Sequence, residues 1–222
     1  MINRRAVMLH GSPKPIERSA SGRLGRLLAE PLESEGWTIT WIHLPAAVRS
    51  GEERTRLFES VDAAALVVLA APLYVDSLPA QAIEALEFLA GHRRAMSAEQ
   101  SPNFATLLNC GFAEPNHNAT CQQICRAFAQ EAGFQWMGEL SFGAAGHVNR
   151  RVKRILRVAG DALSIGVPIP LHAMRSARRP IIPRLVYILG GNTMWRRSAK
   201  QAHGLEVAEL LARPYTDEDG SG

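Results

Sequence analysis

The sequence lacks the features of secreted, membrane-spanning and disulfide-stabilised proteins. It has three cysteines in 222 residues, an odd and small number that argues against a disulfide framework. Its longest apolar run, Ala63 to Leu73, is about half of the roughly 20 residues that a bilayer requires. The N-terminus has two arginines but no apolar segment followed by a small-residue cleavage site, so we expect no signal peptide. These absences favour a cytoplasmic protein with one substantial core.

Two common nucleotide-binding motifs are also absent. The first apolar segment, 6–10, leads into Gly11-Ser12-Pro13-Lys14, which has neither the Gly-Lys-Ser/Thr ending of a triphosphate loop nor the Gly-x-Gly-x-x-Gly spacing of a dinucleotide turn. Cys121 and Cys125 lie four residues apart on an expected helix, and three thiols do not supply the four ligands of an iron–sulfur cluster. We expect both cysteines to be buried structural residues and predict no metal site.

Apolar segments alternate with helical patterns along the first two thirds of the chain. Strands are expected at 6–10, 37–43, 66–71, 104–109 and 134–142, and helices at 21–35, within 49–60, at 82–89 and at 120–132. The continuously apolar segment 66–71 is typical of a central parallel strand, whereas 37–43 mixes polar and apolar residues and is expected nearer an edge. The alternation predicts an α/β fold with a doubly wound, five-stranded parallel sheet.

Ligands of such sheets bind beyond the carboxyl ends of the strands. Three connections there are richer than plain turns: a serine-containing loop up to residue 22, the segment 72–79, and the segment 110–117. The first loop enters a helix, whose unpaired N–H groups form an anion site to which Ser12, Ser19 and Ser21 could add hydroxyl donors. An ordinary connection with a serine cap explains this loop equally well.

Taken together, the three loops resemble those of the flavodoxin-like NAD(P)H-dependent FMN reductase family, over roughly residues 4 to 146. The matching stretches are Gly-Ser-Pro-Lys with serines before a helix, Pro-Leu-Tyr-Val-Asp-Ser-Leu-Pro-Ala, and Asn-Cys-Gly-Phe. The resemblance implies bound FMN, NAD(P)H as reductant, and frequently a homodimer with flavins near the subunit interface. The chain departs from the family at 15–18, where Glu17 would repel a phosphate unless it points away.

The resemblance also implies which residues hold the cofactor. The phosphate side would consist of Ser12, Lys14, Ser19 and Ser21, one side of the flavin would be lined by Pro72, Leu73, Tyr74 and Val75, and the other side by Asn109, Cys110, Gly111 and Phe112. Tyr74 either stacks on the ring or packs under the next helix. No catalytic residue is assigned, because hydride chemistry at a flavin requires no protein nucleophile. His117 is either a proton donor to the acceptor or, more simply, a turn residue.

The function implied is that of an FMN-dependent NAD(P)H oxidoreductase. Hydride would pass from the nicotinamide to the flavin, and electrons from there to a small acceptor such as a quinone, another flavin or a nitro compound. The alternative is an FMN-binding electron carrier or redox-sensing interaction protein without its own nicotinamide turnover. A third hypothesis is an interaction module that has kept the fold and lost the cofactor.

Residues beyond the expected sheet have a strong charge asymmetry. Between His147 and His203 there are twelve basic side chains and one acid, Asp161, so this segment has a formal charge of about +11 and the rest about −7, given +4 overall. We expect domains at 1–146 and 147–222, the second a basic, mainly helical extension that packs on the same domain or on a dimer partner. Apolar positions predict helices at 152–165 and 197–212.

The basic segment is open to several interpretations. Its arginines are expected to be exposed or to face the 2′-phosphate of NADPH. An anionic membrane surface is the next partner considered, because basic flanks on apolar segments suit lipid headgroups. Nucleic acid is less favoured, since no recognition helix or aromatic stacking pattern accompanies the charge. A plain solvated basic face is as good an explanation as any of these.

Overall fold

A five-stranded parallel sheet forms the centre of the molecule. The computed structural model describes residues 3–96, 101–144, 147–204 and 209. The strands are β1 (Arg5–His10), β2 (Thr38–His43), β3 (Leu66–Pro72), β4 (Asn103–Asn109) and β5 (Gln135–Phe142), in the order β2-β1-β3-β4-β5. Every neighbouring pair is parallel. The predictions of a central third strand and an edge position for the second are therefore confirmed.

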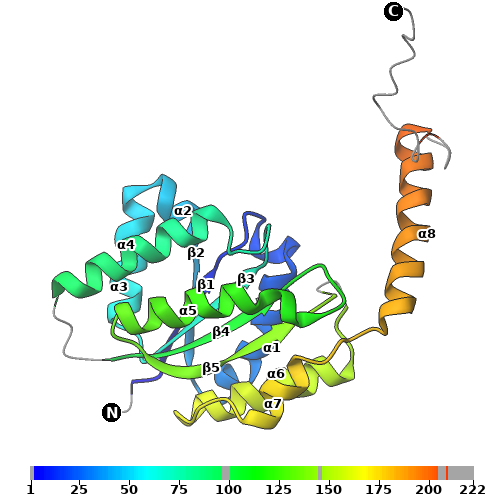
Figure 1. Cartoon of the computed structure of the whole chain (residues 1–222). Coiled ribbons are helices and arrows are strands. Elements are labelled where there is room, and N and C mark those ends of the chain that lie inside the picture. The colour runs from blue at the N-terminus through cyan, green and yellow to red at the C-terminus, as the bar shows by residue number, and fades with distance from the viewer. Residues whose placement is uncertain (1–2, 97–100, 145–146, 205–208, 210–222) are drawn as a thin grey trace, which may run out of the picture. The chain divides into compact units, whose positions relative to one another are not determined.

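Helices cover both faces of this sheet (Figure 1). One face carries α2 (Leu44–Arg49), α3 (Gly51–Asp62), α4 (Ala80–Met96) and α5 (Ala119–Glu131), and the other carries α1 (Ala20–Ser34), α6 (Arg150–Ser164) and α7 (Leu171–Ala177). Successive strand residues supply the two cores alternately: Val67 and Leu69 pack in the first, Leu66 and Val68 in the second. This is the doubly wound arrangement that the sequence predicts.

The helix α2 was not predicted from the sequence. It is one and a half turns long, its Pro45 lies in the first turn where a missing N–H costs nothing, and Leu44 and Ala47 are buried. Ser50 ends it and caps α3, its Oγ accepting a hydrogen bond from the backbone N–H of Glu53 at 3.3 Å. A segment this short carries too few apolar positions for a periodicity to be recognised.

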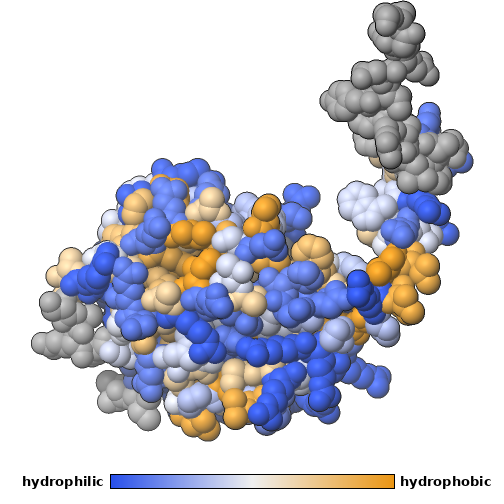
Figure 2. All heavy atoms as spheres, viewed as in Figure 1, coloured by the Kyte–Doolittle hydropathy of each residue, from blue (hydrophilic) through white to orange (hydrophobic). Residues whose placement is uncertain are grey.

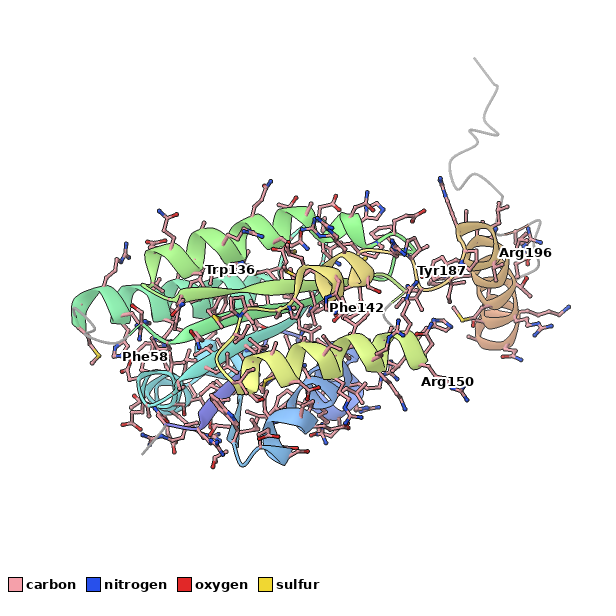
Figure 3. All side chains as sticks on the ribbon, turned by 90° about the horizontal axis from the view of Figure 1, so that it is seen from below. Phe58, Trp136, Phe142, Arg150, Tyr187 and Arg196 are labelled. Carbon is pink, nitrogen blue, oxygen red and sulfur yellow. The ribbon has the colours of Figure 1, made fainter. Side chains whose placement is uncertain are left out.

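The helix α6 belongs to the sheet domain. It buries one apolar side, including Val152, Leu156 and Leu163, and it approaches α1 closely at Gly160, where a Cβ would lie 2.7 Å from the Leu28 carbonyl oxygen. Its first residue, Arg150, points away from the sheet (Figure 3). The chain divides into two compact units between residues 181 and 182, so the boundary expected after residue 146 falls inside the first unit. Buried residues of α6 belong to the core on this face of the sheet.

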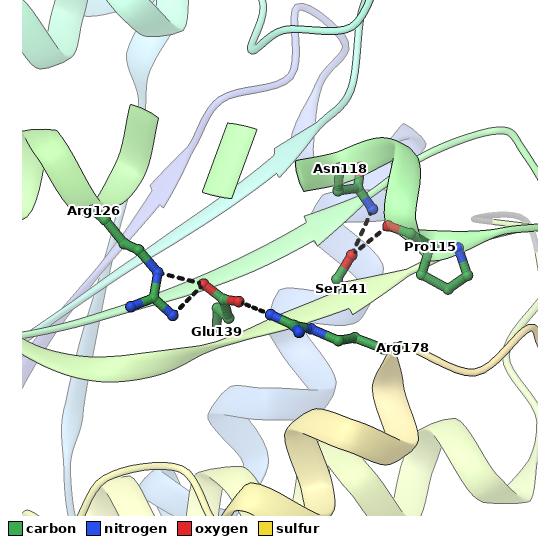
Figure 4. Close-up of polar contacts among 6 residues, drawn as sticks. All are labelled: Pro115, Asn118, Arg126, Glu139, Ser141 and Arg178. Atoms are coloured by element: carbon green, nitrogen blue, oxygen red, sulfur yellow. Dashed lines mark hydrogen bonds and ion pairs between the residues drawn. The ribbon is translucent and has the colours of Figure 1, made fainter. Parts of the chain in front are cut away.

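The edge strand β5 is covered by the segment leading into α7. The backbone N–H of Ile169 donates to the Met137 carbonyl at 2.7 Å, and Ile169 also packs beside Gly138, whose φ of +118° suits glycine. Glu139, buried on the same strand, forms ion pairs with Arg126 of α5 and Arg178 just after α7 (Figure 4). One buried carboxylate and two half-exposed arginine side chains thus join α5, on one face, and the end of α7, on the other face, to the edge strand β5.

The second unit contains one long helix, α8 (Arg184–His203). It begins well before residue 197, where the sequence analysis placed its start, because the apolar stretch 185–189 is helical too. Of the helix expected up to residue 212, residues 205–208 and 210–212 lie outside the described residues. No helix in the described part of the chain is long and apolar enough to cross a bilayer.

Candidate functional site

Three loops meet at the carboxyl edge of the sheet. They are loop A (residues 11–19, after β1), loop B (73–79, after β3) and loop C (110–118, after β4). Backbone hydrogen bonds join the strand ends from which they start: the Gly11 N–H donates to the Ala70 carbonyl at 3.0 Å, and the Leu73 N–H donates to the Asn109 carbonyl at 2.7 Å. The structure therefore brings the three predicted segments side by side at one edge.

Loop A is tightly folded over the start of α1. Ser19 caps the helix, its Oγ accepting a hydrogen bond from the Gly22 backbone N–H at 2.9 Å. Just before it, Ile16–Arg18 form a 3₁₀ turn. A Cβ at Gly22 would lie only 2.1 Å from the Ile16 carbonyl oxygen, so this fold of the loop requires glycine there.

His10, at the end of β1, is fully buried and contacts two serines of this region. Its Nε2 lies 2.7 Å from the Ser19 Oγ and 3.4 Å from the Ser21 Oγ. The Ser19 hydroxyl donates to the Ile16 carbonyl at 3.3 Å and accepts from the Gly22 N–H, and the Ser21 hydroxyl lies 3.5 Å from it as a long second donor. The much shorter contact of 2.7 Å with His10 favours a proton on His10 Nε2 as the nearer donor to Ser19. That tautomer leaves Nδ1 as a bare acceptor, and this buried Nδ1 has no hydrogen-bond partner among the described residues.

The neighbouring strand contributes a second histidine. His43 ends β2 directly opposite His10 in the register, and the two rings stack with centroids 5.4 Å apart. Its Nε2 donates to the Ser12 carbonyl oxygen at 2.9 Å. Burial, with a smaller contribution from His43, lowers the pKa of His10 to about 4. His10, which its lowered pKa keeps neutral near pH 7, and His43 thus fasten loop A near its two ends, at Ser19 and Ser12.

The remaining residues of loop A differ in exposure. Ser12 is buried and its Oγ accepts a hydrogen bond from the Lys14 backbone N–H at 3.2 Å, while the Lys14 side chain is exposed. Glu17 forms an ion pair with Arg26 at 2.9 Å, which offsets its charge. Its carboxylate still acts on His10, because it raises the pKa of that residue against the larger effect of burial. Ser12, Ser19 and Ser21 are all buried, with Ser19 at the cap of α1 and Ser21 in its first turn.

Loop B makes a tight turn that exposes its tip. The backbone groups of Tyr74 and Ser77 exchange two hydrogen bonds, at 2.8 and 3.1 Å, and between them Val75 and Asp76 have φ angles of 49° and 58°. Such positive φ angles are unfavourable for a β-branched residue such as Val75 and are often found near binding sites. Tyr74 and Val75 are exposed, whereas Leu73 is buried. Of the predicted residues on this loop, Tyr74 and Val75 are the accessible ones.

Loop C combines an exposed ring with a buried amide. Phe112 is half exposed and stacks on His117 at 4.2 Å between ring centroids. Asn109, at the end of β4, is buried, and its Oδ1 has no hydrogen-bond partner in the described part of the chain. A Cβ at Gly111 would meet no atom within 4 Å, so packing within the chain does not explain glycine there.

Cys110 is held inside loop C. It is buried, its Sγ lies 3.6 Å from the Glu114 carbonyl oxygen, and desolvation raises the pKa of its thiol. It therefore lacks the thiolate character of a nucleophile. Cys121 and Cys125 are buried in the core beside it, as predicted, and burial raises the pKa of Cys121 to about 12.

A polar cluster fixes loop C to β5. The Asn118 side chain donates to the Ser141 Oγ at 2.9 Å, and that hydroxyl donates to the Pro115 carbonyl at 2.9 Å (Figure 4). Neither Asn118 nor His10 was singled out as a site residue from the sequence. For His10 the available signal was a polar side chain at the end of an apolar strand, whereas Asn118 lies nine residues beyond the end of β4 and offered no such signal.

The edge as a whole suits an elongated ligand. Loop A offers a helix start and buried hydroxyls for an anionic group, and loops B and C offer exposed rings. Two buried amide oxygens, the Oδ1 atoms of Asn109 at the end of β4 and of Asn118 in loop C, have no hydrogen-bond partner among the described residues. Among the described residues, no group of three or more histidine, cysteine or acidic side chains is placed to hold a metal ion.

Solved structures with related folds were found by structural comparison. An NADH:FMN oxidoreductase in its apo form is 19% identical, with 82% of this chain and 97% of that chain covered and a TM-score of 0.55. An NAD(P)H:quinone oxidoreductase from Methanothermobacter marburgensis is 15% identical, with 72% and 95% covered and a TM-score of 0.53. An FMN-dependent NADH-azoreductase from Bacillus anthracis, in complex with FMN, is 12% identical, with 72% and 99% covered and a TM-score of 0.54.

The fold is flavodoxin-like. Flavodoxins from Agrobacterium tumefaciens and from an archaeon also match, with TM-scores of 0.52 and 0.51. The chain spans 37% of a rubredoxin:oxygen oxidoreductase from Desulfovibrio gigas, with 11% identity. No protein-family model and no curated protein sequence matches the chain. The neighbours' names agree with the family resemblance of the three loops, and at these identities the likeness establishes the fold.

Proposed function

We propose that the protein is an FMN-dependent NAD(P)H oxidoreductase that passes electrons to a small acceptor. The observation that carries the proposal is the meeting of loops A, B and C at one sheet edge, where a serine-capped helix start and two exposed aromatic side chains come from neighbouring loops. Three of the structural neighbours are named as oxidoreductases that use FMN, a quinone or an azo compound. When bound, FMN would supply the hydride and electron chemistry.

Loop A would hold the phosphate. The start of α1 provides positive potential, and Ser12 and Ser19 provide hydroxyl hydrogens close to it. Rotation of the Ser19 hydroxyl from the Ile16 carbonyl, 3.3 Å away, toward the anion would leave its contacts with His10 and Gly22 intact. The exposed Lys14 would add a mobile positive charge.

Loops B and C would hold the ring system. Tyr74 and Phe112 are exposed aromatic side chains, one from each loop, and flat apolar surfaces are what an isoalloxazine ring requires. The unpaired Oδ1 of Asn109 would accept a hydrogen bond from an N–H of the ligand, which removes the cost of leaving a buried acceptor unsatisfied. Open space beside Gly111 lets the ligand approach the backbone.

Anaerobic reduction distinguishes this proposal from an electron carrier. The purified chain is loaded with FMN, excess flavin is removed, and NADH or NADPH is added without oxygen. Rapid loss of the visible flavin absorbance, followed by its return on addition of a quinone, is the expected result. Loaded protein that stays yellow would instead support an FMN-binding carrier. A chain that takes up no FMN would overturn both and favour an interaction module.

A further inference from the structure

The helix α8 exposes large apolar side chains in a way that soluble proteins rarely do. Leu185, Leu189 and Trp195 have relative exposures of 75%, 67% and 72%, and Val186, Ile188 and Met194 are exposed as well. In the space-filling view, hydrophobic side chains gather over the first half of this helix (Figure 2). Exposed apolar groups that cluster in this way indicate a surface that something else covers.

The apolar residues have helical spacing. Ile188 and Leu189 follow Leu185 by three and four residues, and Trp195 follows Ile188 by seven, so these four lie along one side of α8. Arg196, seven residues after Leu189, shares this side, whereas Val186 and Met194 lie outside it. The helix has 20 residues and is therefore about 30 Å long. The exposed apolar positions run from Leu185 to Trp195, along half of the length of α8, so a covering surface would lie along the helix.

The charged residues of α8 and of the segment before it are all basic. Between Asp161 and Glu206 the sequence contains no acidic residue, whereas α8 itself carries Arg184, Arg196, Arg197 and Lys200. Arg196 and Arg197 are exposed, within three residues of Met194 and Trp195 (Figure 3 labels Arg196). Long basic side chains beside an indole ring are typical of helices that lie at the boundary of lipid headgroups and acyl chains.

We infer that α8 binds the surface of an anionic lipid bilayer, with Leu185, Ile188, Leu189 and Trp195 in the interfacial layer and the long side chains of Arg196 and Arg197 extending to the phosphate level. Burial of the apolar side chains of α8 away from water is favourable, and its positive charges are attracted to a negatively charged surface. The inference does not depend on the proposed function, because it concerns a separate compact unit.

A second copy of the chain is a less suitable cover. To bind the basic helix α8, a second copy would have to offer an apolar groove that is lined by more acidic than basic side chains. The hollow between α1 and α6, about 600 Å³, is lined by Lys153, Arg154 and Arg157 as well as by Glu30, Glu35 and Asp161. It offers no such excess, and two copies of α8 would repel each other.

Vesicle flotation tests the inference with the full-length chain. Binding is measured with vesicles of phosphatidylcholine alone and with vesicles in which a third of the lipid is phosphatidylglycerol. We expect roughly tenfold or stronger preference for the anionic vesicles, falling as salt screens the charges. The variant Leu185→Ser/Leu189→Ser/Trp195→Ser should lose binding to both kinds of vesicle. The variant Arg196→Gln/Arg197→Gln should lose the preference for anionic lipid.

A matched control comes from the first unit. Ile165, Val167 and Leu171 have relative exposures of 73%, 46% and 65%, and the variant Ile165→Ser/Val167→Ser/Leu171→Ser should bind anionic vesicles like the unchanged chain. Circular dichroism of each variant checks that the fold is kept. No vesicle binding, equal losses in the control and the α8 variants, or an α8 variant that only converts a dimer to a monomer would overturn the inference.

Discussion

The Nε2 of His10 lies 2.7 Å from the Oγ of Ser19, and this contact joins the end of the first strand to the cap of the first helix. His10 is fully buried and does not reach the ligand-facing surface. Its effect on an anion at loop A would be indirect. By donating to Ser19, it leaves the serine hydroxyl hydrogen available for a phosphate oxygen.

Replacement of His10 should weaken phosphate recognition in particular. We expect His10→Phe to bind FMN roughly tenfold less tightly, since one charge-assisted hydrogen bond to the phosphate loses its fixed geometry. Riboflavin lacks the phosphate, so its affinity should be unchanged, and a fluorescence titration with both ligands measures the difference. The control His172→Phe changes an exposed histidine on α7 and should leave both affinities unaltered. Equal weakening of both ligands would contradict this role.

The stability of the protein should depend on pH through His10. Its pKa is about 4 in the folded chain and 6.5 as the ordinary value, so the unfolded chain binds its proton first as the pH falls. The contribution to stability is complete above pH 6.5 and is lost between pH 6.5 and 4, by at most about 3 kcal/mol. Urea unfolding across this range should show a shallower pH dependence for His10→Phe. If the unfolding free energies of His10→Phe and of the unchanged chain vary with pH in parallel, His10 is not the group that causes the pH dependence.

The fold of loop A should be intolerant of a side chain at Gly22. A Cβ there would lie 2.1 Å from the Ile16 carbonyl oxygen, so Gly22→Ala must displace the 3₁₀ turn or the helix start. We expect a loss of about 2 kcal/mol in unfolding free energy and of most FMN affinity. Gly91→Ala, inside α4 with no atom within 4 Å, should instead stabilise the chain by about 0.5–1 kcal/mol. Thermal unfolding of the two variants gives the comparison, and similar changes in both would contradict it.

Neutralising Glu139 should lower the free energy of unfolding more than neutralising a surface acid in a similar ion pair. Its carboxylate is buried between Arg126 and Arg178, so Glu139→Gln removes the charge that both guanidinium groups share. We expect a loss of about 2–3 kcal/mol in the free energy of unfolding. Glu131→Gln breaks an exposed pair with Arg94, 2.6 Å long, and should cost under about 1 kcal/mol. Denaturant titration of both variants measures the difference, and comparable losses would mean that burial does not strengthen the Glu139 pairs.

Much of the fold could be predicted from the sequence because a parallel sheet leaves a strong pattern. The segment 66–71 is apolar throughout since β3 is covered on both faces, and the mixed segment 37–43 lies at the edge as its polarity predicted. Glycines at positions 36 and 133 end their helices with positive φ angles. Helix α2 escaped prediction because six residues show no period.

Features that depend on tertiary packing could not be predicted. The apolar positions of 152–165 predicted a helix that packs on the same domain or on a dimer partner, but the sequence did not show which. The buried side of α6 and its close approach to α1 at Gly160 show that it is part of the first unit. The serines of loop A could be recognised as an anion-binding pattern. Their shared contact with His10 depends on the folding of loop A back over the helix start.

The most direct test of the account is a titration of the purified chain with FMN, followed by flavin fluorescence and by calorimetry. We predict one FMN per chain, quenched by the aromatic side chains of loops B and C, with an affinity at least about tenfold above that of riboflavin. An unquenched flavin, or an affinity no higher for FMN than for riboflavin, would contradict the assignment of loop A to the phosphate and of Tyr74 and Phe112 to the ring.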